Sequence, residues 1–192
     1  MMIKNHKDII DLVQNDDMMM KILNIVKFLK LPDCWICAGI IRNRIWDALH
    51  HFEEPTMIED VDVIYFDSNS IDEKIDKSIE ERLYTIHPNI NWSVKNQARM
   101  HKRNGDDPYK STEDAVSKFP ETATAIAVRL NEEDNVDLIT PCGIEDLVNL
   151  IVRPTKHFLR NANTKAKVYE DRLQKKKWQE KWDKLAIIHM DF

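Results

Sequence analysis

The sequence predicts an α+β fold in which a mixed β-sheet is flanked by helices. Three observations support this. Apolar residues make up 43% of the chain, enough to fill a real core. Stretches with strand character and stretches with helical apolar spacing both occur. They follow one another without strict βαβ alternation, which favours a mixed sheet. With 192 residues in total, we expect residues 1–192 to form a single domain.

The N-terminal part predicts two helices within about residues 6–30, because apolar residues recur there at helical spacing. Asn15-Asp16 supplies a plausible cap between them. Pro32-Asp33 breaks the chain, and the apolar run 34–38 predicts a short buried strand. Gly39 ends that strand, and the next segment has one apolar helical face: Ile41, Ile45, Trp46 and Leu49.

The middle of the chain alternates between strand and helix. Residues 61–66 are rich in β-branched and aromatic residues and predict a strand, and residues 90–95 predict another by their alternation. The charged segment 70–83 predicts a surface helix. A short helix is expected over 97–101, closed by Asn104-Gly105.

The C-terminal part begins with a capping pattern at Ser111, which predicts a helix that ends at Pro120. Strands are predicted at 124–130 and 136–140, separated by a polar turn. A helix follows over 145–152. A basic helix is expected over about 165–185, where eight basic and four acidic residues give a local charge of +4.

Composition excludes several classes of protein. Three glycines are too few for a Gly-rich phosphate loop of the Rossmann or Walker kind. The net charge of −5 argues against a dedicated duplex-DNA binder. No apolar run reaches the roughly 18 residues of a membrane helix. The three cysteines, without a secretion signal, predict reduced thiols and a cytoplasmic protein. Cys34 and Cys37 have redox-motif spacing but lie within the predicted strand, so no thiol function is expected.

Asp60 and Asp62 are the strongest candidates for a site. Residues two apart on a strand point to one face, about 7 Å apart. Adjacent carboxylates repel each other unless a cation or proton intervenes, and Mg²⁺ is commonly held by one or two carboxylates together with substrate phosphates. The pair therefore predicts a metal site, with a merely solvated strand end as the alternative.

Gly39 is the second candidate, because a glycine between a strand and a helix lets a phosphate approach free backbone N–H groups. Arg42 lies one turn further on and could reach the same anion. A tight turn without a ligand is the alternative.

Together these segments resemble the nucleotidyltransferase superfamily, which contains DNA polymerase beta and the aminoglycoside nucleotidyltransferases. The ordered blocks are Ala38-Gly39-Ile40-Ile41-Arg42-Asn43, Asp60-Val61-Asp62, Lys95-Asn96-Gln97-Ala98-Arg99-Met100-His101, Pro108-Tyr109, Pro120-Glu121-Thr122-Ala123 and Gly143-Ile144-Glu145-Asp146-Leu147. The series is similar to a family of bacterial nucleotidyltransferase-like proteins, mostly of unknown function, from about Trp35 to Trp182. Ile40 departs from the superfamily pattern, which has Ser or Gly after the glycine.

The resemblance implies that Asp60 and Asp62 hold Mg²⁺ or Mn²⁺, and that Gly39, Arg42, Asn43 and Lys95 receive the phosphates of a nucleoside triphosphate. An acceptor hydroxyl, of unknown identity, would attack the α-phosphate. The superfamily usually adds a third carboxylate from a neighbouring strand. Residues 91–95 offer Ser93 in its place, so Asp137 is the expected substitute.

The polar corner at 95–101 is the third candidate site. Asn96, Gln97, Arg99 and His101 would contact nucleotide, with Gln97 and His101 on one helical face. Tyr109 could stack on a base. The alternatives are a hydrogen-bonded structural corner and a buried tyrosine.

The basic segment carries Trp178 and Trp182 four residues apart on one helical face, which favours docking on the domain with the lysines in water. An RNA-binding surface is the alternative. Three functions follow: a Mg²⁺-dependent nucleotidyltransferase, a catalytically inactive nucleotide- or metal-binding module on the same fold, and an RNA-associated protein.

Overall fold

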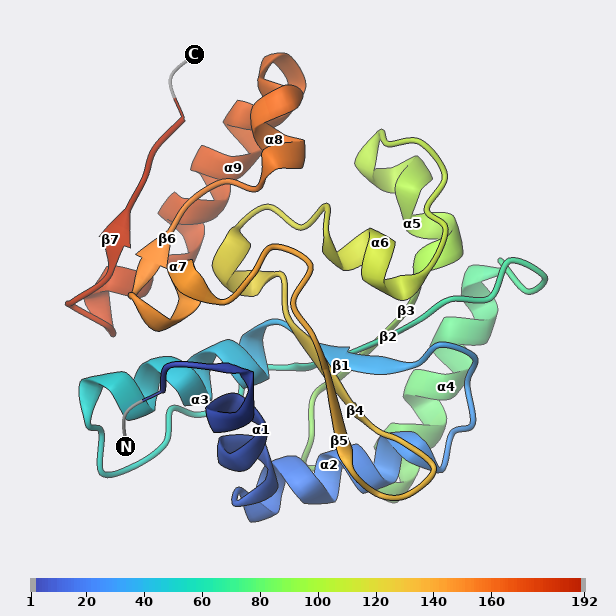
Figure 1. Ribbon diagram of the computed structural model, residues 1–192. Helices are drawn as coiled ribbons and strands as arrows, with labels where there is room; N and C mark the ends of the chain where they lie inside the picture. The colour runs from blue at the N-terminus through green and yellow to red at the C-terminus, as the bar shows by residue number, and fades with distance from the viewer. Residues whose placement is uncertain (1–2, 191–192) are drawn as a thin grey trace.

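A five-stranded mixed sheet lies at the centre of the structure, a computed structural model that describes residues 3–190 (Figure 1). The strands are β1 (Trp35–Cys37), β2 (Val61–Tyr65), β3 (Trp92–Asn96), β4 (Ala127–Leu130) and β5 (Val136–Ile139). Their order across the sheet is β3-β2-β1-β4-β5. The helices on both sides confirm the predicted α+β architecture.

The register of the sheet fixes the surroundings of the acidic pair. Strand β1 pairs antiparallel with β2 and β4, β2 runs parallel to β3, and β4 and β5 form an antiparallel hairpin. Asp62 lies opposite Cys37 of β1 on one side and opposite Ser93 of β3 on the other. Asp60 precedes the first residue of β2. The acidic pair therefore lies at the start of β2, with the edge strand β3 beside it.

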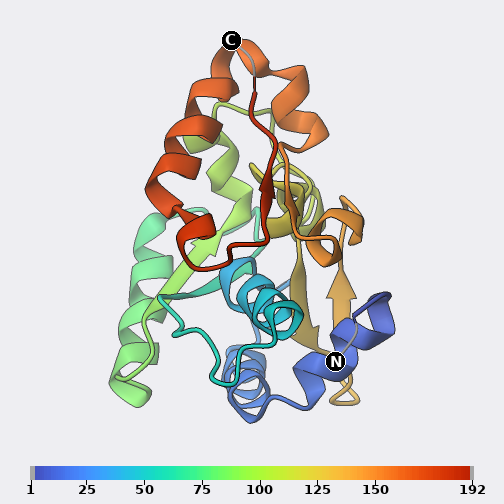
Figure 2. The same ribbon diagram turned by 90° about the vertical axis from the view of Figure 1, so that its left-hand side faces the viewer.

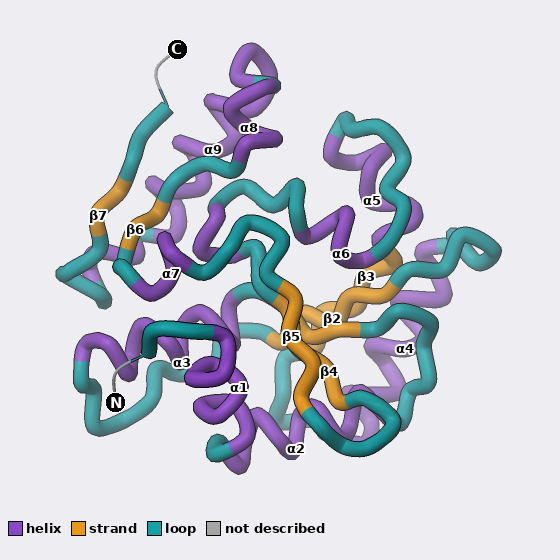
Figure 3. Tube along the Cα trace, in the orientation of Figure 1, coloured by secondary structure: helices purple, strands orange, loops and turns teal. Residues whose placement is uncertain are grey.

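Helices account for most of the remaining chain (Figure 3). The α-helices are α1 (His6–Gln14), α2 (Asp17–Lys27), α3 (Gly39–His50), α4 (Glu73–Ile86), α5 (Gln97–Asn104), α6 (Thr112–Val116), α7 (Glu145–Val148), α8 (Lys156–Arg160) and α9 (Ala162–Lys176). Two 3₁₀ turns, η1 (Thr122–Thr124) and η2 (Trp178–Glu180), and a two-stranded sheet of β6 (Ile151–Val152) and β7 (Ala186–Ile187) complete the described chain. Within residues 3–190, no helix has both the length and the apolar composition needed to cross a bilayer.

The two faces of the sheet bury different side chains. Alternate strand residues, including Ile36, Val63 and Val94, join the large core formed with α1, α2, α3 and α4. The opposite face carries a smaller cluster around Trp35 and Ile64, covered by α6 and the segment after it. Figure 1 shows α2 and α4 below the sheet and α5 and α6 above it. Asp62 shares the face of Ile64, because the two are separated by one residue on β2.

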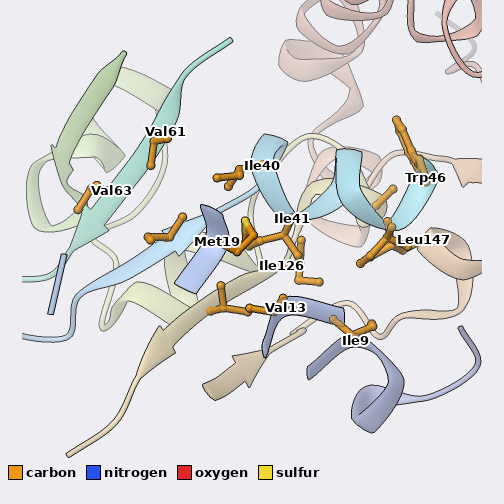
Figure 4. Packing of buried hydrophobic residues seen from close by; sticks show 14 of the residues in the cluster. Ile9, Val13, Met19, Ile40, Ile41, Trp46, Val61, Val63, Ile126 and Leu147 are labelled. Carbon is orange, nitrogen blue, oxygen red and sulfur yellow. The ribbon is translucent and has the colours of Figure 1, made fainter. Parts of the chain in front are cut away.

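Helix α3 crosses the large core and carries the candidate phosphate-binding residues at its start. Ile40, Ile41 and Trp46 belong to the same buried cluster as Met19 of α2 and Ile126 (Figure 4). All three are at most 2% exposed, so burial fixes the helix against the sheet. The first turn of α3, beside Asp62, is thereby held in place.

Besides the helix that begins after Ser111, which ends at Val116 and not at Pro120, two of the predicted helices are shorter than expected. The helix predicted over 145–152 ends at Val148, because Leu150 adopts a left-handed conformation (φ 59°) and Ile151 pairs with Ala186 in the small sheet. The helix predicted over 165–185 ends at Lys176, where Lys177 is left-handed (φ 47°). Both ends are set by pairing and packing with distant residues, which local helical spacing does not report.

The segment after α9 docks on α3 (Figure 2). The rings of Trp178 and Trp182 meet Trp46 edge to face, with centroids 5.7 and 5.1 Å away. The indole N–H of Trp182 donates to buried Asp47 at 2.9 Å. Trp178 and Trp182 are therefore packing residues, as the docking interpretation predicted.

Candidate functional site

A cleft of about 260 Å³ lies between the start of β2, the first turn of α3 and the last turns of α9. Its polar lining comes from these three elements: Asn43 and Arg42 from α3, Glu59, Asp60 and Asp62 from the β2 side, and Arg172 and Lys176 from α9. Gly39 also lines it. Five of the predicted site residues, Gly39, Arg42, Asn43, Asp60 and Asp62, are thus brought together.

The acidic pair contains one carboxyl with an altered proton affinity. Burial, and then the neighbouring charge of Asp60, raise the pKa of Asp62 above its ordinary value of 3.8. A hydrogen bond with Ser93 and the charges of Arg172 and Lys176 oppose the rise without cancelling it. The ionised form of Asp62 is therefore destabilised in the protein alone, and a bound cation would stabilise it.

The start of α3 is an uncapped helix N-terminus. Ala38, at the N-cap, has φ 54° and ψ −112°, a conformation that costs an L-residue energy, and no side chain caps the helix. A Cβ added at Gly39 would meet only Arg42 Nη2, at 3.9 Å, so packing within the protein does not require glycine there. The open space beside Gly39 lies in the cleft, where an anion could approach the backbone.

Arg42 is a buried cation at the wall of the cleft. Its guanidinium lies 4.5 Å from the Trp178 ring centroid and 4.9 Å from that of Trp46. Nη2 donates to Asn43 Oδ1 at 2.8 Å, whereas the buried Nε has no partner within residues 3–190. Burial lowers the pKa of Arg42 to about 10, so the group stays charged at neutral pH. A desolvated guanidinium with a spare donor is suited to bind an anion.

Arg172 and Lys176 of α9 are cleft residues that were not predicted as part of the site. Their spacing of four residues places both on one helical face. Arg172 Nε donates to the fully buried carboxylate of Glu121 at 2.7 Å, and Lys176 lies 3.4 Å from Glu59. The signal was present in the basic composition of residues 165–185, but only the docking of the segment after α9 on α3 shows which two cations of α9 line the cleft with the acidic pair.

The acidic and the basic residues of the cleft come from different elements of the fold. Three acids lie at the start of β2 and three cations line the side formed by α3 and α9. Oxygen-only donors such as Asp60 and Asp62 match the preference of Mg²⁺ and Mn²⁺, so the residues present fit a hard divalent ion. Across residues 3–190 there is no group of three or more His, Cys, Asp or Glu side chains arranged to hold a metal. The candidate metal site therefore consists of two carboxylates.

Asp137 lies away from the pair, contrary to its expected role as third carboxylate. It is on β5, three strand intervals from β2, which corresponds to about 14 Å. Its carboxylate accepts from Arg129 Nε at 3.0 Å and from Asn131 at 3.1 Å. The physical reason is the strand order, because β1 and β4 intervene between β2 and β5.

The polar corner at 95–101 also lies outside the cleft lining. Asn96 is three residues along β3 from Ser93, about 10 Å away. Its side chain caps α5 and donates to the Asp67 and Ser70 carbonyls. Arg99 pairs with buried Asp76, and Lys95 pairs with Glu80 at 3.0 Å. Gln97 is buried and donates to the Lys95 carbonyl. These hydrogen bonds match the structural-corner alternative.

His101 of α5 and Tyr109 lie together, with ring centroids 6.1 Å apart. Tyr109 is 5% exposed and donates to Asp106 at 2.5 Å, so its ring is not open for stacking on a base. Asp106 also accepts from Lys165 at 2.7 Å and contacts His157 Nε2 at 2.8 Å. This network joins the segment after α5 to α8 and α9.

Comparison with known proteins identifies the family and the fold. A nucleotidyltransferase family model matches residues 24–187. An NMR structure described as revealing a CCA-adding enzyme head domain is 39% identical, with a TM-score of 0.88 and 98% of each chain covered. No curated protein matches the chain.

Two larger enzymes share the fold at low identity. A Thermotoga maritima CCA-adding enzyme complexed with tRNA is 13% identical with a TM-score of 0.58, and a CCA-adding enzyme complexed with CTP is 12% identical with a TM-score of 0.58. The matches cover 94% and 97% of this chain but only 42% and 44% of those chains. The chain thus spans less than half of their length. Since the family model covers most of the sequence and the 39% identical structure covers nearly all of it, the chain belongs to the nucleotidyltransferase family.

Proposed function

We propose that this protein transfers a nucleoside monophosphate from a nucleoside triphosphate to an acceptor hydroxyl, with Mg²⁺ or Mn²⁺ as cofactor. The observation that carries the proposal is the single cleft that combines Asp60 and Asp62, the uncapped start of α3 and the buried, incompletely paired Arg42. Fold relatives complexed with CTP and with ATP support a triphosphate as the donor.

Each part of the cleft has a role in this reaction. The backbone at Gly39 and the first turn of α3 would receive the terminal phosphates. Arg42, Arg172 and Lys176 would offset the charge that moves onto the leaving pyrophosphate. Asp60 and Asp62 would hold the metal, which supplies charge stabilisation for the attacking and leaving oxygens. In the transfer, the acceptor hydroxyl loses its proton to solvent and its oxygen bonds to the α-phosphorus, while the bond from the α-phosphorus to the bridging oxygen breaks and pyrophosphate leaves.

The test compares Mg²⁺-dependent nucleotide binding in matched variants. A panel of the four nucleoside triphosphates, with and without Mg²⁺, identifies the donor by the rise in melting temperature, because a ligand that binds only the native state stabilises it. Asp60→Asn and Asp62→Asn should abolish the Mg²⁺-dependent part of this rise. Asp137→Asn, in a carboxylate remote from the cleft, should leave it unchanged. Equal Mg²⁺-dependent affinity in all three variants would disprove the metal site.

A second variant tests the phosphate role of Gly39. Gly39→Ala should fold, since its Cβ would make only an ordinary contact with Arg42 and alanine favours a helix. It should nevertheless weaken triphosphate binding, because the methyl group occupies the side from which a phosphate approaches the backbone. Unchanged affinity in a normally folded Gly39→Ala variant would remove the start of α3 from the site.

Binding without turnover is the second candidate function. It is favoured by Ser93, a residue without a carboxylate, which stands opposite Asp62 on β3. Release of labelled pyrophosphate from the triphosphate, measured with an acceptor panel that includes tRNA, distinguishes the two. An RNA acceptor draws support from the tRNA complex of a fold relative and from the basic α9.

A further inference from the structure

We infer that a second anion subsite, formed by Arg42 and the lysine-rich turn after α9, binds condensed phosphate without a metal. The inference rests on the proposed function for its biological context, because pyrophosphate is the product that nucleotidyl transfer releases. Its physical basis is independent of that reaction. It consists of a separate hollow, an incompletely paired buried cation and a local excess of positive charge.

The second hollow has a volume of about 340 Å³ and adjoins the acidic cleft. The two share Arg42, Asn43, Glu59 and Lys176 as lining residues, but Asp60 and Asp62 line only the first. The remaining lining comes from the end of α9 and the turn after it. A ligand in the second hollow would therefore contact the end of α9 and Arg42 without being lined by Asp60 or Asp62.

The charge of this hollow is strongly unbalanced. Five basic and two acidic side chains line it, which gives a net charge of +3. The basic residues are Arg42, Lys175, Lys176, Lys177 and Lys181. Lys177 pairs with exposed Glu180 at 3.0 Å and Lys176 lies 3.4 Å from exposed Glu59, both contacts that water screens. Four lysines within seven residues repel one another, and a multiply charged anion would relieve that repulsion.

Arg42 provides the second, independent observation. Its side chain is 5% exposed, and its buried Nε has no hydrogen-bond partner within residues 3–190. The guanidinium lies against the rings of both Trp46 and Trp178. It therefore cannot turn to find another acceptor without disturbing the core. The desolvated charge of this guanidinium is thus only partly compensated within the protein, and an anion held at the wall of the hollow would be attracted to it.

The shape and chemistry favour condensed phosphate over a nucleic-acid strand. Single-stranded nucleic acids are usually held by exposed aromatic rings that stack on bases, as well as by cations. Trp178 and Trp182 are only 5% and 2% exposed, with their rings packed against Trp46, and so they offer no stacking surface. The hollow instead presents an excess of cations, five basic against two acidic side chains, which suits the high charge density of linked phosphates.

Isothermal titration in EDTA tests the inference on the full chain, with pyrophosphate and tripolyphosphate as probes. We expect both to bind, tripolyphosphate more tightly. Lys181→Gln and Lys176→Gln should each weaken binding about five-fold at low salt, the factor that one unit-charge contact in water is worth. Lys167→Gln is the matched control, because it removes the same charge from an exposed position of α9 outside both hollows. It should change affinity less than two-fold.

Three results would overturn the inference. These are no binding of tripolyphosphate in EDTA, an equal loss in Lys167→Gln and Lys181→Gln, or tighter binding of a single-stranded RNA oligonucleotide that Lys181→Gln abolishes. Asp62→Asn separates this site from the proposed function, since it should remove Mg²⁺-dependent nucleotide binding and leave tripolyphosphate binding in EDTA intact. Weaker Mg²⁺-ATP binding in Lys181→Gln would identify the terminal phosphates of the nucleotide as the natural occupant, and unchanged Mg²⁺-ATP binding would identify free pyrophosphate or polyphosphate.

Discussion

Glu121 is the buried support of the cationic wall, and its replacement should affect both stability and the cleft. Its side chain is fully buried after α6 and accepts hydrogen bonds from Arg172 Nε and Thr124 Oγ1, each at 2.7 Å. Arg172 lines the cleft, and Thr124 belongs to η1. One carboxylate therefore connects the loop before β4 to α9 and directs Arg172 toward the acidic pair.

The structure sets the size of the effect. Glu121→Gln keeps the volume and one acceptor oxygen but removes the charge, so each bond falls from about 1.5–3 kcal/mol to about 0.5–1.5 kcal/mol. The Arg172 side chain is 33% exposed, and water compensates part of that loss. We expect a net destabilisation of about 1–2 kcal/mol. Glu121→Ala removes both acceptors and leaves the partly exposed Arg172 guanidinium and the Thr124 hydroxyl without their partner, so we expect a larger loss, up to about 3 kcal/mol.

Urea unfolding followed by circular dichroism measures these differences, with Asp171→Asn in an exposed pair as the control. That control should change stability by less than about 0.5 kcal/mol. A double-mutant cycle with Arg172→Gln isolates the pair, for which a coupling of about 0.5–3 kcal/mol is expected. A coupling below about 0.3 kcal/mol, or a Glu121→Gln variant as stable as the wild type, would refute the reasoning.

Two further predictions follow from altered proton affinities. The pKa of Asp62 is raised by burial and by Asp60, so its ionised form costs stability above the unfolded pKa of 3.8. Asp62→Asn should therefore raise the midpoint of urea unfolding at pH 7 without metal, and this gain should vanish below pH 3.8. The control Asp137→Asn should give no gain. Equal midpoints for the wild type and Asp62→Asn at pH 7 would contradict the prediction. Burial raises the pKa of Cys34 to about 12 and that of Cys37 well above its ordinary value. Both thiols should resist alkylation at pH 8 until the chain unfolds in urea, and rapid labelling of the native protein, read by mass spectrometry, would contradict this.

Local features predicted much of the fold because they depend on neighbouring residues. The strand at 61–66 follows from its β-branched and aromatic content, and it appears as β2. The helix after Gly39 follows from apolar spacing, and the helix closed at Asn104-Gly105 ends where Gly105 adopts φ 67°. The family resemblance, confirmed by the family model and by the 39% identical structure, likewise rests on short ordered motifs.

Predictions that required a distant partner were less successful. Asp137 was chosen because it lies on a strand, but the order of strands decides which acid meets the pair, and two strands separate β5 from β2. The polar corner was chosen for its density of donors. Yet Arg99 and Asn96 bind Asp76 and the carbonyls of Asp67 and Ser70, partners that no local pattern reveals.

The sequence by itself determined the acidic pair, the glycine-started helix and the family, because each depends on residue types at fixed short spacing. Only the tertiary structure decided which cations face that pair. Arg172 and Lys176 reach the cleft because the segment directly after α9 docks on α3, and Arg42 is held there by Trp178, which lies more than 130 residues further along the chain. Packing of distant side chains sets these positions, and a one-dimensional pattern contains no measure of it.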